Sequence, residues 1–477
     1  MGSRKVTSTV SADFQGKHVT VAGLGVSGIP AAKVLHARGA LVTVVNDGDD
    51  ARAREQAAEL EALGITVRLG DGATLPEGTD LIVTAPGWKP DKPLFEAARA
   101  AGVEIWGDVE LAWRLRGPDA APWLAITGTN GKTTTTQMLA SILKAAGLRT
   151  AAVGNIGVSV LDAVLGEEQY DVLAVELSSY QLHWAPSLRA HSAAVLNLAP
   201  DHLDWHGSME AYARDKGRVY EGNRVACVYN VADKATEDLV READVEEGCR
   251  AIGFTLGSPG PSQLGVVDGI LVDRAFVENR QKNAQELAEV SDVNPPAPHN
   301  IANALAAAAL ARAFGVPAKA VRDGLRAFTP DAHRIAHVAD VDGVAYVDDS
   351  KATNTHAAEA SLAAYESIVW IAGGLAKGAS FDELVAKSAK RLRGVVLIGA
   401  DRALIREALA RHAPEVPVVD LDRTDTGAML QAVTEAKRLA RPGDTVLLAP
   451  ACASMDMFTN YNKRGDAFAE AVRELGS

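Results

Sequence analysis

The chain has 477 residues, of which 47% are hydrophobic and 23% charged, with a net charge of −13 at pH 7. A chain of this length predicts about three domains, because single cores stop growing near 250–300 residues. The acidic balance argues against nucleic acid or an anionic membrane as the main partner. Only three cysteines occur, and no apolar run approaches the roughly 20 residues that span a bilayer. We therefore expect a cytoplasmic protein that neither binds nucleic acid nor inserts into membranes.

The first region, Lys17 to Trp113, alternates apolar strands with amphipathic helices, which predicts a parallel sheet. Within it, "VTVAGLGVSGIPAAKVL" places Gly23, Gly25 and Gly28 between a strand and a helix, and Asp47 follows the next strand. Such a pattern predicts a Rossmann-like site for a nucleoside diphosphate. An NAD cofactor and a UDP-sugar both satisfy it.

The polar stretch "RLRGPDAAPW" predicts a linker, and a second break falls near "FTPDAHR". These breaks divide the chain into residues 1–112, 113–329 and 330–477. The predicted fold is α/β, with an N-terminal Rossmann-like domain, a central P-loop ATPase-like domain and a C-terminal Rossmann-like domain.

The central region opens with "LAITGTNGKTTTTQMLA", a strand, a glycine turn and a helix around Lys132. The full P-loop pattern would require glycine where Ile126 stands. A helix N-terminus and a lysine nonetheless predict a polyphosphate site. The alternative is a lysine in an ordinary turn between a strand and a helix.

Glu176 ends the apolar strand of "AVELSSYQL". A carboxylate beside a lysine loop predicts a magnesium ligand, with Thr133 as a second oxygen ligand. Local capping through Ser178 and Ser179 is the alternative.

The stretch "NLAPDHLDWHGSMEAYARDKGRVY" holds His202 and His206, four residues apart. The spacing suggests a zinc pair, but no third ligand is evident, and one imidazole near phosphate or magnesium is an equal alternative. From the residues alone, Lys216 reads as a solvated surface lysine.

The third region places three cations, Lys351, Lys377 and Arg464, near strand ends or loops. Four polar residues accompany them: Asp349, Ser350, Thr353 and Ser454. Such a group predicts a site for a small dicarboxylate or a phosphate, whereas ordinary surface salt bridges are the alternative.

Nine motifs occur in one order: "GLGVSG", "TGTNGKTT", "GNIG", "ELSSYQL", "DHLDWHG", "HNIANAL", "HR", "DDSKATN" and "PACASMDMF". By this set the chain resembles the Mur ligases, in particular their D-glutamate-adding members, over nearly its whole length. These ligases use a short lysine loop without the leading glycine. The resemblance implies ATP-driven ligation of D-glutamate to UDP-N-acetylmuramoyl-L-alanine through an acyl phosphate, in cytoplasmic peptidoglycan precursor synthesis. It also implies a monomer.

The resemblance implies that residues 1–112 bind the UDP-substrate, residues 113–329 bind ATP and residues 330–477 bind the amino acid. The implied UDP-substrate residues are Gly25, Val26, Ser27, Asn46, Asp47, Gly87, Asn155 and His202. Which of Asn46 and Asp47 serves the uracil side stays open. The implied ATP residues are Gly128, Thr129, Asn130, Gly131, Lys132, Thr133, Thr134, Asn300, Asn303, His333, Arg334 and Asp349. The implied D-glutamate residues are Thr353, Lys377, Ser454, Met455 and Tyr461.

The implied catalytic residues are Lys132, Glu176, His202, Lys216 and Lys351. Two magnesium ions would be held by Thr133, Glu176, His202 and Lys216, the last as a carbamylated lysine. Two departures from the family stand out. Some relatives have Asp where this chain has Leu375 or Ala376, and Ala85 replaces a frequent serine.

Other functions remain open on the residues. An NAD-dependent oxidoreductase fits the first region but leaves the lysine loop unexplained, and a non-catalytic nucleotide-binding regulator would bind ATP without turnover. "GLGVSG" disfavours the L-alanine-adding ligase and folylpolyglutamate synthetase, and the absence of a D-N-P-R-like signature disfavours the diaminopimelate- or lysine-adding ligase.

Overall fold

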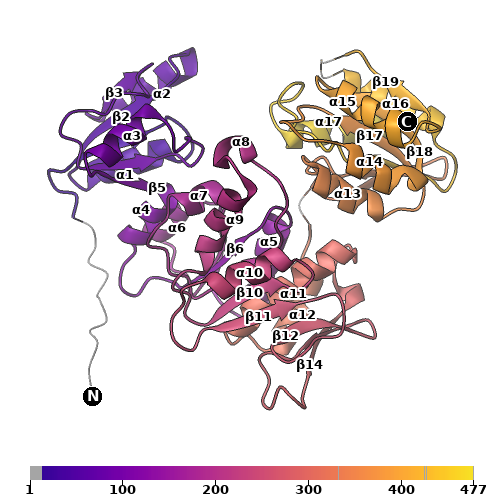
Figure 1. Cartoon of the computed structure of the whole chain (residues 1–477), viewed down its shortest axis with the longest axis horizontal. Coiled ribbons are helices and arrows are strands. Elements are labelled where there is room, and N and C mark those ends of the chain that lie inside the picture. The colour runs from indigo at the N-terminus through magenta and orange to yellow at the C-terminus, as the bar shows by residue number, and fades with distance from the viewer. Residues whose placement is uncertain (1–12, 331, 424, 426, 476–477) are drawn as a thin grey trace. The chain divides into compact units, whose positions relative to one another are not determined.

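The computed structural model describes residues 13–330, 332–423, 425 and 427–475. Its chain divides into two compact units, residues 1–328 and 329–477, and each is described by itself. Three sheets can be followed by colour in Figure 1: one of five strands, one of nine and one of six.

The first sheet is parallel throughout and has the order β3-β2-β1-β4-β5. Its strands are β1 His18–Ala22, β2 Leu41–Asn46, β3 Thr66–Leu69, β4 Leu81–Thr84 and β5 Glu104–Gly107. The accompanying helices are α1 Gly28–Ala37, α2 Ala51–Glu61, α3 Pro93–Ala100 and α4 Asp108–Leu115. Chain order reverses between β1 and β4, the position at which such sheets bind ligands beyond the strand ends.

The second sheet has the order β14-β13-β12-β11-β10-β9-β6-β8-β7. Its strands are β6 Trp123–Thr127, β7 Ala152–Gly154, β8 Leu173–Glu176, β9 Ser192–Val195, β10 Ala226–Asn230, β11 Arg250–Phe254, β12 Gln263–Val267, β13 Ile270–Asp273 and β14 Gln285–Glu289. The first seven run parallel, whereas β13 and β14 form an antiparallel extension that the sequence pattern did not predict.

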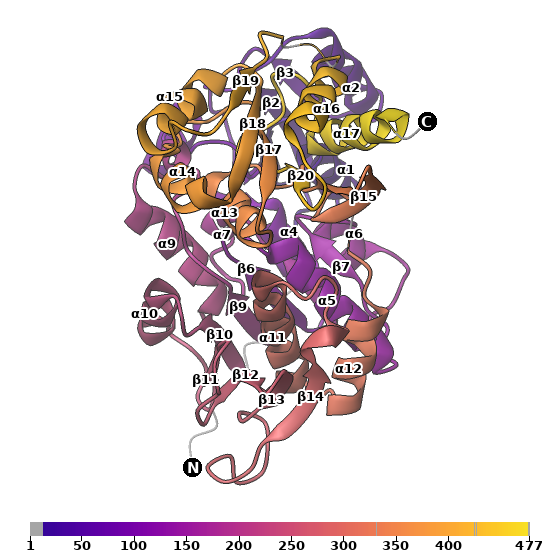
Figure 2. The same ribbon diagram turned by 90° about the vertical axis from the view of Figure 1, so that its right-hand side faces the viewer.

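The helices of this region are α5 Lys132–Ala145, α6 Val160–Leu165, α7 Ser179–His183, α8 Leu203–His206, α9 Met209–Gly217, α10 Lys234–Glu242, α11 Pro298–Ala313 and α12 Ala318–Ala327. Short 3-10 turns cover Arg218–Tyr220 and Val290–Asp292. Helices α5, α11 and α12 pack together on one face of the sheet, as Figure 2 shows, and bury Ile126, Met138 and Leu305 among others. The alanine run of α11 lets these helices approach closely, since alanine adds little bulk.

The opposite face of the second sheet is covered partly by α4 and α6, so a single core joins the first two sheets. Val109 and Trp113 of α4 are buried in the same cluster as Leu161 of α6. The predicted linker "RLRGPDAAPW" therefore begins inside a packed helix. The predicted boundary at residue 112 also falls within α4, and both proposed domain boundaries stay predictions.

The third sheet has the order β15-β16-β20-β17-β18-β19 and is parallel except for the hairpin of β15 and β16. Its strands are β15 Ala336–Val341, β16 Val344–Asp348, β17 Ile368–Gly373, β18 Leu392–Ile398, β19 Val418–Asp420 and β20 Thr445–Leu448. The helices are α13 Thr355–Ala363, α14 Asp382–Ser388, α15 Arg402–His412, α16 Ala428–Leu439 and α17 Tyr461–Leu475, with a 3-10 turn at Ala389–Arg391. Separate clusters of buried apolar residues line its two faces, one with α13 to α15 and the other with α16 and α17.

Candidate active site

The lysine loop connects β6 to α5, as its sequence predicts. Gly131 caps α5 with φ of +83°, a conformation that favours glycine. A Cβ on Gly131 would lie 2.4 Å from Oδ1 of Asn303, so glycine is also required for space. The Asn130 backbone N–H donates to Oδ1 of Asn197 at 2.8 Å, which ties the loop to the segment after β9. The result is a fixed loop that opens on a helix N-terminus.

Two lysines meet the same atom of this loop. Nζ of Lys132 donates to the Gly128 carbonyl at 2.9 Å and to that of Thr129 at 3.0 Å. Nζ of Lys216 also donates to the Gly128 carbonyl at 2.9 Å and approaches the Thr127 hydroxyl at 3.4 Å. The two lysine nitrogens therefore lie beside the same loop carbonyl, close to the N-terminus of α5, which favours anions.

Lys216 is 2% exposed and lies over the ring of Tyr212, 4.8 Å from its centroid. Burial, with a further contribution from the charge of Lys132, lowers its pKa well below the ordinary value, against the opposing charges of Asp201 and Glu176. The reading of Lys216 as a solvated surface lysine is therefore wrong. Its position near the loop depends on how α9 packs, which the sequence pattern does not reveal.

Glu176 ends β8, beside β6, and is 2% exposed. Its Oε1 accepts a hydrogen bond from Nδ2 of Asn155 at 2.9 Å, while its Oε2 has no hydrogen-bond partner among the described residues. Thr133, the first residue after the loop lysine, is also buried. A buried carboxylate oxygen without a partner is the expected mark of a site that takes a cation.

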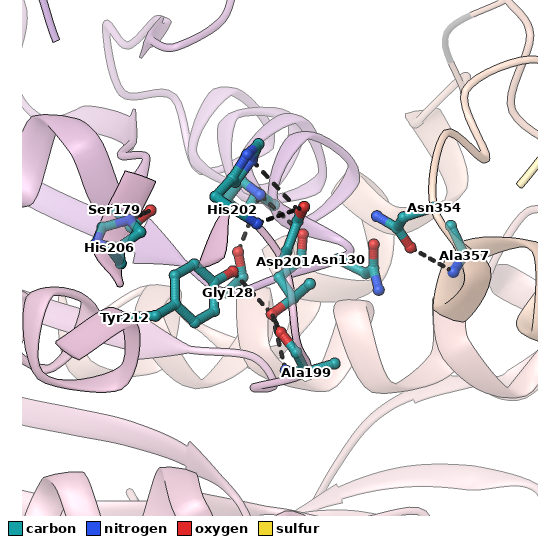
Figure 3. Close-up of polar contacts among 12 residues, drawn as sticks. Gly128, Asn130, Ser179, Ala199, Asp201, His202, His206, Tyr212, Asn354 and Ala357 are labelled. Atoms are coloured by element: carbon teal, nitrogen blue, oxygen red, sulfur yellow. Dashed lines mark hydrogen bonds and ion pairs between the residues drawn. The ribbon is translucent and has the colours of Figure 1, made fainter. Parts of the chain in front are cut away.

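His202 and Asp201 lie on the strand-end loop that follows β9, near Gly128 and Asn130 (Figure 3). His202 adopts a left-handed backbone with φ of +53°. Its Nε2 lies 3.4 Å from Oδ2 of Asp201, and its ring packs at 4.9 Å on Tyr180. Asp201 was not among the predicted site residues, although it precedes His202 directly.

His206 does not share a site with His202. It is fully buried, with Nδ1 3.0 Å from Asp215 and Nε2 3.0 Å from the Ser179 hydroxyl (Figure 3). The residues that the structure describes contain no group of three His, Cys, Asp or Glu side chains placed to hold a metal. The zinc pair is therefore disfavoured, and the single-imidazole reading of His202 remains.

The far side of the loop is formed by α11. Asn300 and Asn303 are both buried, and Nδ2 of Asn303 donates to Oδ1 of Asn300 at 3.3 Å. Because Asn303 also faces Gly131, the structure brings both predicted nucleotide asparagines to the loop. Thr134 lies in the first turn of α5, three residues after Gly131.

The glycine-rich turn of the first sheet has a defined environment. Ser27 donates to Oδ2 of Asp108 at 2.9 Å, next to Gly25 and the 87% exposed Val26. Burial raises the pKa of Asp108, against the hydrogen bond from Ser27. Trp205 of α8 donates its indole N–H to the Gly87 carbonyl at 3.1 Å, so the first region is tied to the loop that carries His202.

Asn46 and Asp47, the two candidates for the uracil side, have different contacts in the structure. Oδ1 of Asn46 accepts the Leu24 backbone N–H at 3.1 Å and so supports the glycine turn. Asp47 is exposed and pairs with Lys92 at 2.6 Å. Lys92 lies over the ring of Trp88, a residue that the sequence analysis did not single out.

The second unit gathers its predicted residues at one sheet edge. β16, β20 and β17 are neighbours, and Thr353, Ser454 and Lys377 follow them in turn. Carboxyl ends of parallel strands meet at the same edge, which explains this convergence. Nζ of Lys351 lies 3.9 Å from the ring centroid of Tyr461. Met455, the residue after Ser454, is 64% exposed.

His333 and Asp349 flank this edge. Nδ1 of His333 lies 2.6 Å from Asp348, and this hydrogen bond raises the pKa of the imidazole against the effect of burial. Burial raises the pKa of Asp349 to about 6, although Ser361 donates to its carboxylate and Arg334 lies near enough to lower it. The next residue, Ser350, is fully buried.

Arg464 differs from the prediction of a ligand-binding cation. It is 1% exposed and donates to the Ser350 hydroxyl and carbonyl at 3.0 and 2.9 Å and to the Cys452 carbonyl at 3.1 Å. Arg464 therefore joins the loops after β16 and β20. Asp401 accepts the backbone N–H of Ala376, the residue after Leu375, at 2.8 Å.

Three family models match the chain. They are described as Mur ligase MurD-like, N-terminal domain, over residues 17–107; Mur ligase middle domain, over residues 126–311; and Mur ligase, glutamate ligase domain, over residues 333–452. The chain belongs to the Mur ligase family. The predicted three-domain α/β fold of these ligases is confirmed.

Relatives within the Mur ligases match almost end to end. A protein of Streptomyces coelicolor named UDP-N-acetylmuramoylalanine--D-glutamate ligase is 89% identical over 98% of this chain and 99% of its own. A protein of the same name from Thermobifida fusca is 60% identical over 97% and 99%. The structure of a MurF ligase from Thermotoga maritima in complex with ADP shares the fold, with a TM-score of 0.56 at 15% identity, over 98% of this chain and 97% of that one. No helix in the described part of the chain is long and apolar enough to cross a membrane.

Proposed function

We propose that the chain is an ATP-dependent ligase that joins D-glutamate to UDP-N-acetylmuramoyl-L-alanine in cytoplasmic peptidoglycan precursor synthesis. One observation carries the ATP chemistry: the buried Glu176 carboxylate stands beside a lysine loop with one oxygen unpartnered. The choice of substrates is supported by the names of the full-length relatives. The chain acts as a monomer in this proposal.

The reaction follows from the chemistry of the carboxylate. An oxygen of the alanine carboxylate attacks the γ-phosphorus of ATP, the bond to the β-phosphate oxygen breaks, and ADP leaves. The amine of D-glutamate then attacks the acyl carbon, the C–O bond to phosphate breaks, and the nitrogen loses a proton. Phosphorylation is needed because oxide is too poor a leaving group, and exclusion of water protects the acyl phosphate.

Lys132 and the N-terminus of α5 stabilise the phosphates in this scheme. The loop from Gly128 to Thr134 supplies backbone N–H groups, and Lys132 supplies a full charge where negative charge is transferred. Asn300 and Asn303 close the far side of the loop. The family resemblance also assigns His333, Arg334 and Asp349 to the nucleotide.

The residues present fit magnesium. Glu176 offers an unpartnered buried oxygen and Thr133 a hydroxyl, both ligands that this hard cation prefers. In this proposal these two residues would hold the first ion, and His202 and Lys216 would hold the second. Magnesium held there would neutralise charge on the phosphate oxygens.

Lys216 serves as a ligand only after modification, because an ammonium group carries no acceptor. Its nitrogen is buried and shares the Gly128 carbonyl with Lys132. The ammonium loses a proton, the neutral amine adds to CO2, and a second proton leaves to give a carbamate. The modification replaces a positive charge with a negative one and supplies oxygen ligands. We therefore assign Lys216 as carbamylated.

The remaining residues position the two other substrates. The UDP-substrate lies on the turn of Gly25, Val26 and Ser27, with Asp47 or Asn46 at the uracil side and with Gly87, Asn155 and His202 further along. D-Glutamate lies at the edge formed by Thr353, Lys377, Ser454, Met455 and Tyr461, and Lys351 acts on the acyl phosphate. Convergence of these last residues at neighbouring strand ends supports the assignment.

Phosphate release tests the proposal. Purified protein, ATP, magnesium and UDP-N-acetylmuramoyl-L-alanine are incubated in parallel with D-glutamate, L-glutamate, meso-diaminopimelate or L-alanine. We expect phosphate and ligated product with D-glutamate alone. Release with another amino acid, or none with any, would refute the assignment, and tight NADH binding would favour the oxidoreductase alternative.

A further inference from the structure

The edge of the central sheet opposite the lysine loop carries a second group of cations. The strand starts of β6, β9 and β10 lie side by side there. The His191 backbone N–H donates to the Trp123 carbonyl at 3.0 Å, and that of Val225 donates to the His191 carbonyl at 2.9 Å. Arg224 directly precedes Val225, and Arg116 directly follows α4. All these residues belong to the unit of residues 1–328.

Arg116 is held in place by aromatic rings. Its guanidinium carbon lies 3.0 Å from the ring centroid of Trp113, and that ring packs edge-on against Trp123 at 5.0 Å. The Nε atom of Arg116 is shielded from solvent and has no hydrogen-bond partner in the part of the chain that the structure describes. A buried donor without a partner is rare and needs an explanation.

No carboxylate offsets these charges. Within residues 13–475 as described, neither Arg116 nor Arg224 forms an ion pair. Asp244 and Glu246, whose backbone pairs with residues 222 and 223, do not reach Arg224 either. The chain as a whole has a net charge of −13, so two guanidinium groups without an ion pair make this part of it locally positive.

The two guanidinium groups influence each other. Burial, followed by the charge of Arg224, lowers the pKa of Arg116 to about 10 and that of His191 to about 4. An anion among these groups would offset the repulsion between the two guanidinium groups and supply hydrogen-bond acceptors. Guanidinium groups match the oxygens of phosphate in geometry, whereas the neutral imidazole adds no competing charge.

We propose that Arg116 and Arg224 form a binding site for a phosphate-type oxyanion, separate from the lysine loop. Arg116 supplies a preordered, half-buried donor. Arg224 is exposed and supplies a donor on the side from which the anion enters. The ligand is either inorganic phosphate or the terminal phosphate of a nucleotide. The site does not depend on the ligase assignment, because it uses none of the residues assigned to that reaction.

Calorimetric titration tests the site in the Lys132→Ala background, where the loop contributes little to phosphate binding. Inorganic phosphate is titrated into this protein and into the same protein carrying Arg224→Gln, Arg116→Gln or, as a control, Arg52→Gln. Arg52 is an exposed arginine on α2. We expect one phosphate per chain, at least tenfold weaker binding with Arg224→Gln or Arg116→Gln, and unchanged binding with Arg52→Gln.

Arg224→Gln is the decisive variant, since Arg116 packs on Trp113 and its replacement affects the core. In the chain with Lys132 intact, Arg224→Gln should lower the number of bound phosphates from two to one. A parallel titration with ADP identifies the source: Arg224-dependent ADP binding indicates a nucleotide phosphate, and its absence indicates free phosphate. Equal affinity in the Arg224→Gln and parent proteins, or no binding to the parent, would overturn the proposal.

Discussion

At the scale of single residues, the site gathers buried polar and charged groups around one loop. Lys132 and Lys216 share the carbonyl of Gly128, and Glu176 keeps one buried oxygen without a partner. The unpartnered oxygen costs free energy in the isolated chain, because buried polar groups are normally paired. A bound magnesium ion would satisfy this oxygen. Its free-energy cost is therefore best understood as preorganisation for binding.

Replacement of Lys132 by Ala should reduce ligation by about 100-fold or more, since a positioned charge that meets transferred phosphate contributes on this scale. Binding of UDP-N-acetylmuramoyl-L-alanine should stay within about twofold, because its proposed residues lie mainly on the first sheet. Phosphate-release kinetics and direct titration of the UDP-substrate measure the two effects. An equal loss of both would contradict separate sites.

Replacement of Lys216 by Ala should almost abolish ligation, and acetate should restore part of it by filling the space of the carbamate. Lys216→Arg should be inactive without rescue, because guanidinium is permanently charged and cannot form a carbamate. Lys144, an exposed lysine on α5, provides the matched control Lys144→Ala, which should keep full activity. High activity of Lys216→Ala without acetate would leave the modification without support.

Asp349 should make stability depend on pH. Its folded pKa of about 6 lies above the usual 3.8, so the folded chain binds the extra proton and stability falls as pH rises from about 4 to above 6. Asp349→Asn removes this cost and should raise the unfolding free energy at pH 7.5 by roughly 3 kcal/mol, given about 1.4 kcal/mol per pKa unit. Urea unfolding at pH 7.5 and pH 5 should show the gain shrinking at the lower pH. A gain that is equal at both pH values would contradict the raised pKa.

At the scale of elements, three short helices are held by one carboxylate. Asp215 of α9 accepts hydrogen bonds from His183 of α7 at 2.8 Å and from His206 of α8 at 3.0 Å. Burial raises its pKa, but these hydrogen bonds, together with the charges of His183 and Arg218, outweigh burial and lower it to about 2. Lys216 is the next residue, so the same contact orients α9 toward the loop. α7 and α8 are too short to be stable without such tertiary contacts.

Asp215→Asn should lower the unfolding free energy by about 2 kcal/mol, since it leaves one buried imidazole N–H without its charged partner. Because the folded pKa is depressed, this stabilisation is present above the unfolded value of 3.8 and is lost only as pH falls toward 2. Denaturation at pH 7 and pH 5 should therefore give the same difference. Asp238→Asn, a change in an exposed helical pair on α10, serves as the control and should have little effect.

At the scale of the whole molecule, the first two sheets share one core through α4, whereas the third sheet has its own. Among the described residues, no two of the large apolar side chains that remain exposed are consecutive in the chain. Scattered exposed apolar residues are ordinary for monomers and do not indicate an obligate interface.

Light scattering after size exclusion should accordingly give a mass near 50 kDa, that of one chain. The value should stay constant over a tenfold range of protein concentration, because no binding equilibrium between copies is expected. A mass near twice this value would contradict the monomer assignment.

Most elements were predictable because apolar periodicity and glycine placement are local properties. The strand, turn and helix around Lys132 appear as expected, and so do the glycine-rich turn of the first sheet and the parallel core of the third. The antiparallel strands β13 and β14 and the hairpin of β15 were missed. Short edge strands depend on partners distant in sequence, so their local patterns are weak.

By itself, the sequence determined the domain type and the ordered motifs, since glycines, strand ends and lysine loops carry their chemistry at fixed spacing. Only the tertiary structure decided which polar residues are buried and what they meet. In the structure, Lys216 is buried at the lysine loop and not on the surface, His206 pairs with Asp215, and Arg464 joins two loops. Burial and pairing depend on how helices pack on the sheet, and a helix of alternating polar and apolar residues does not reveal which of its polar groups will face another element.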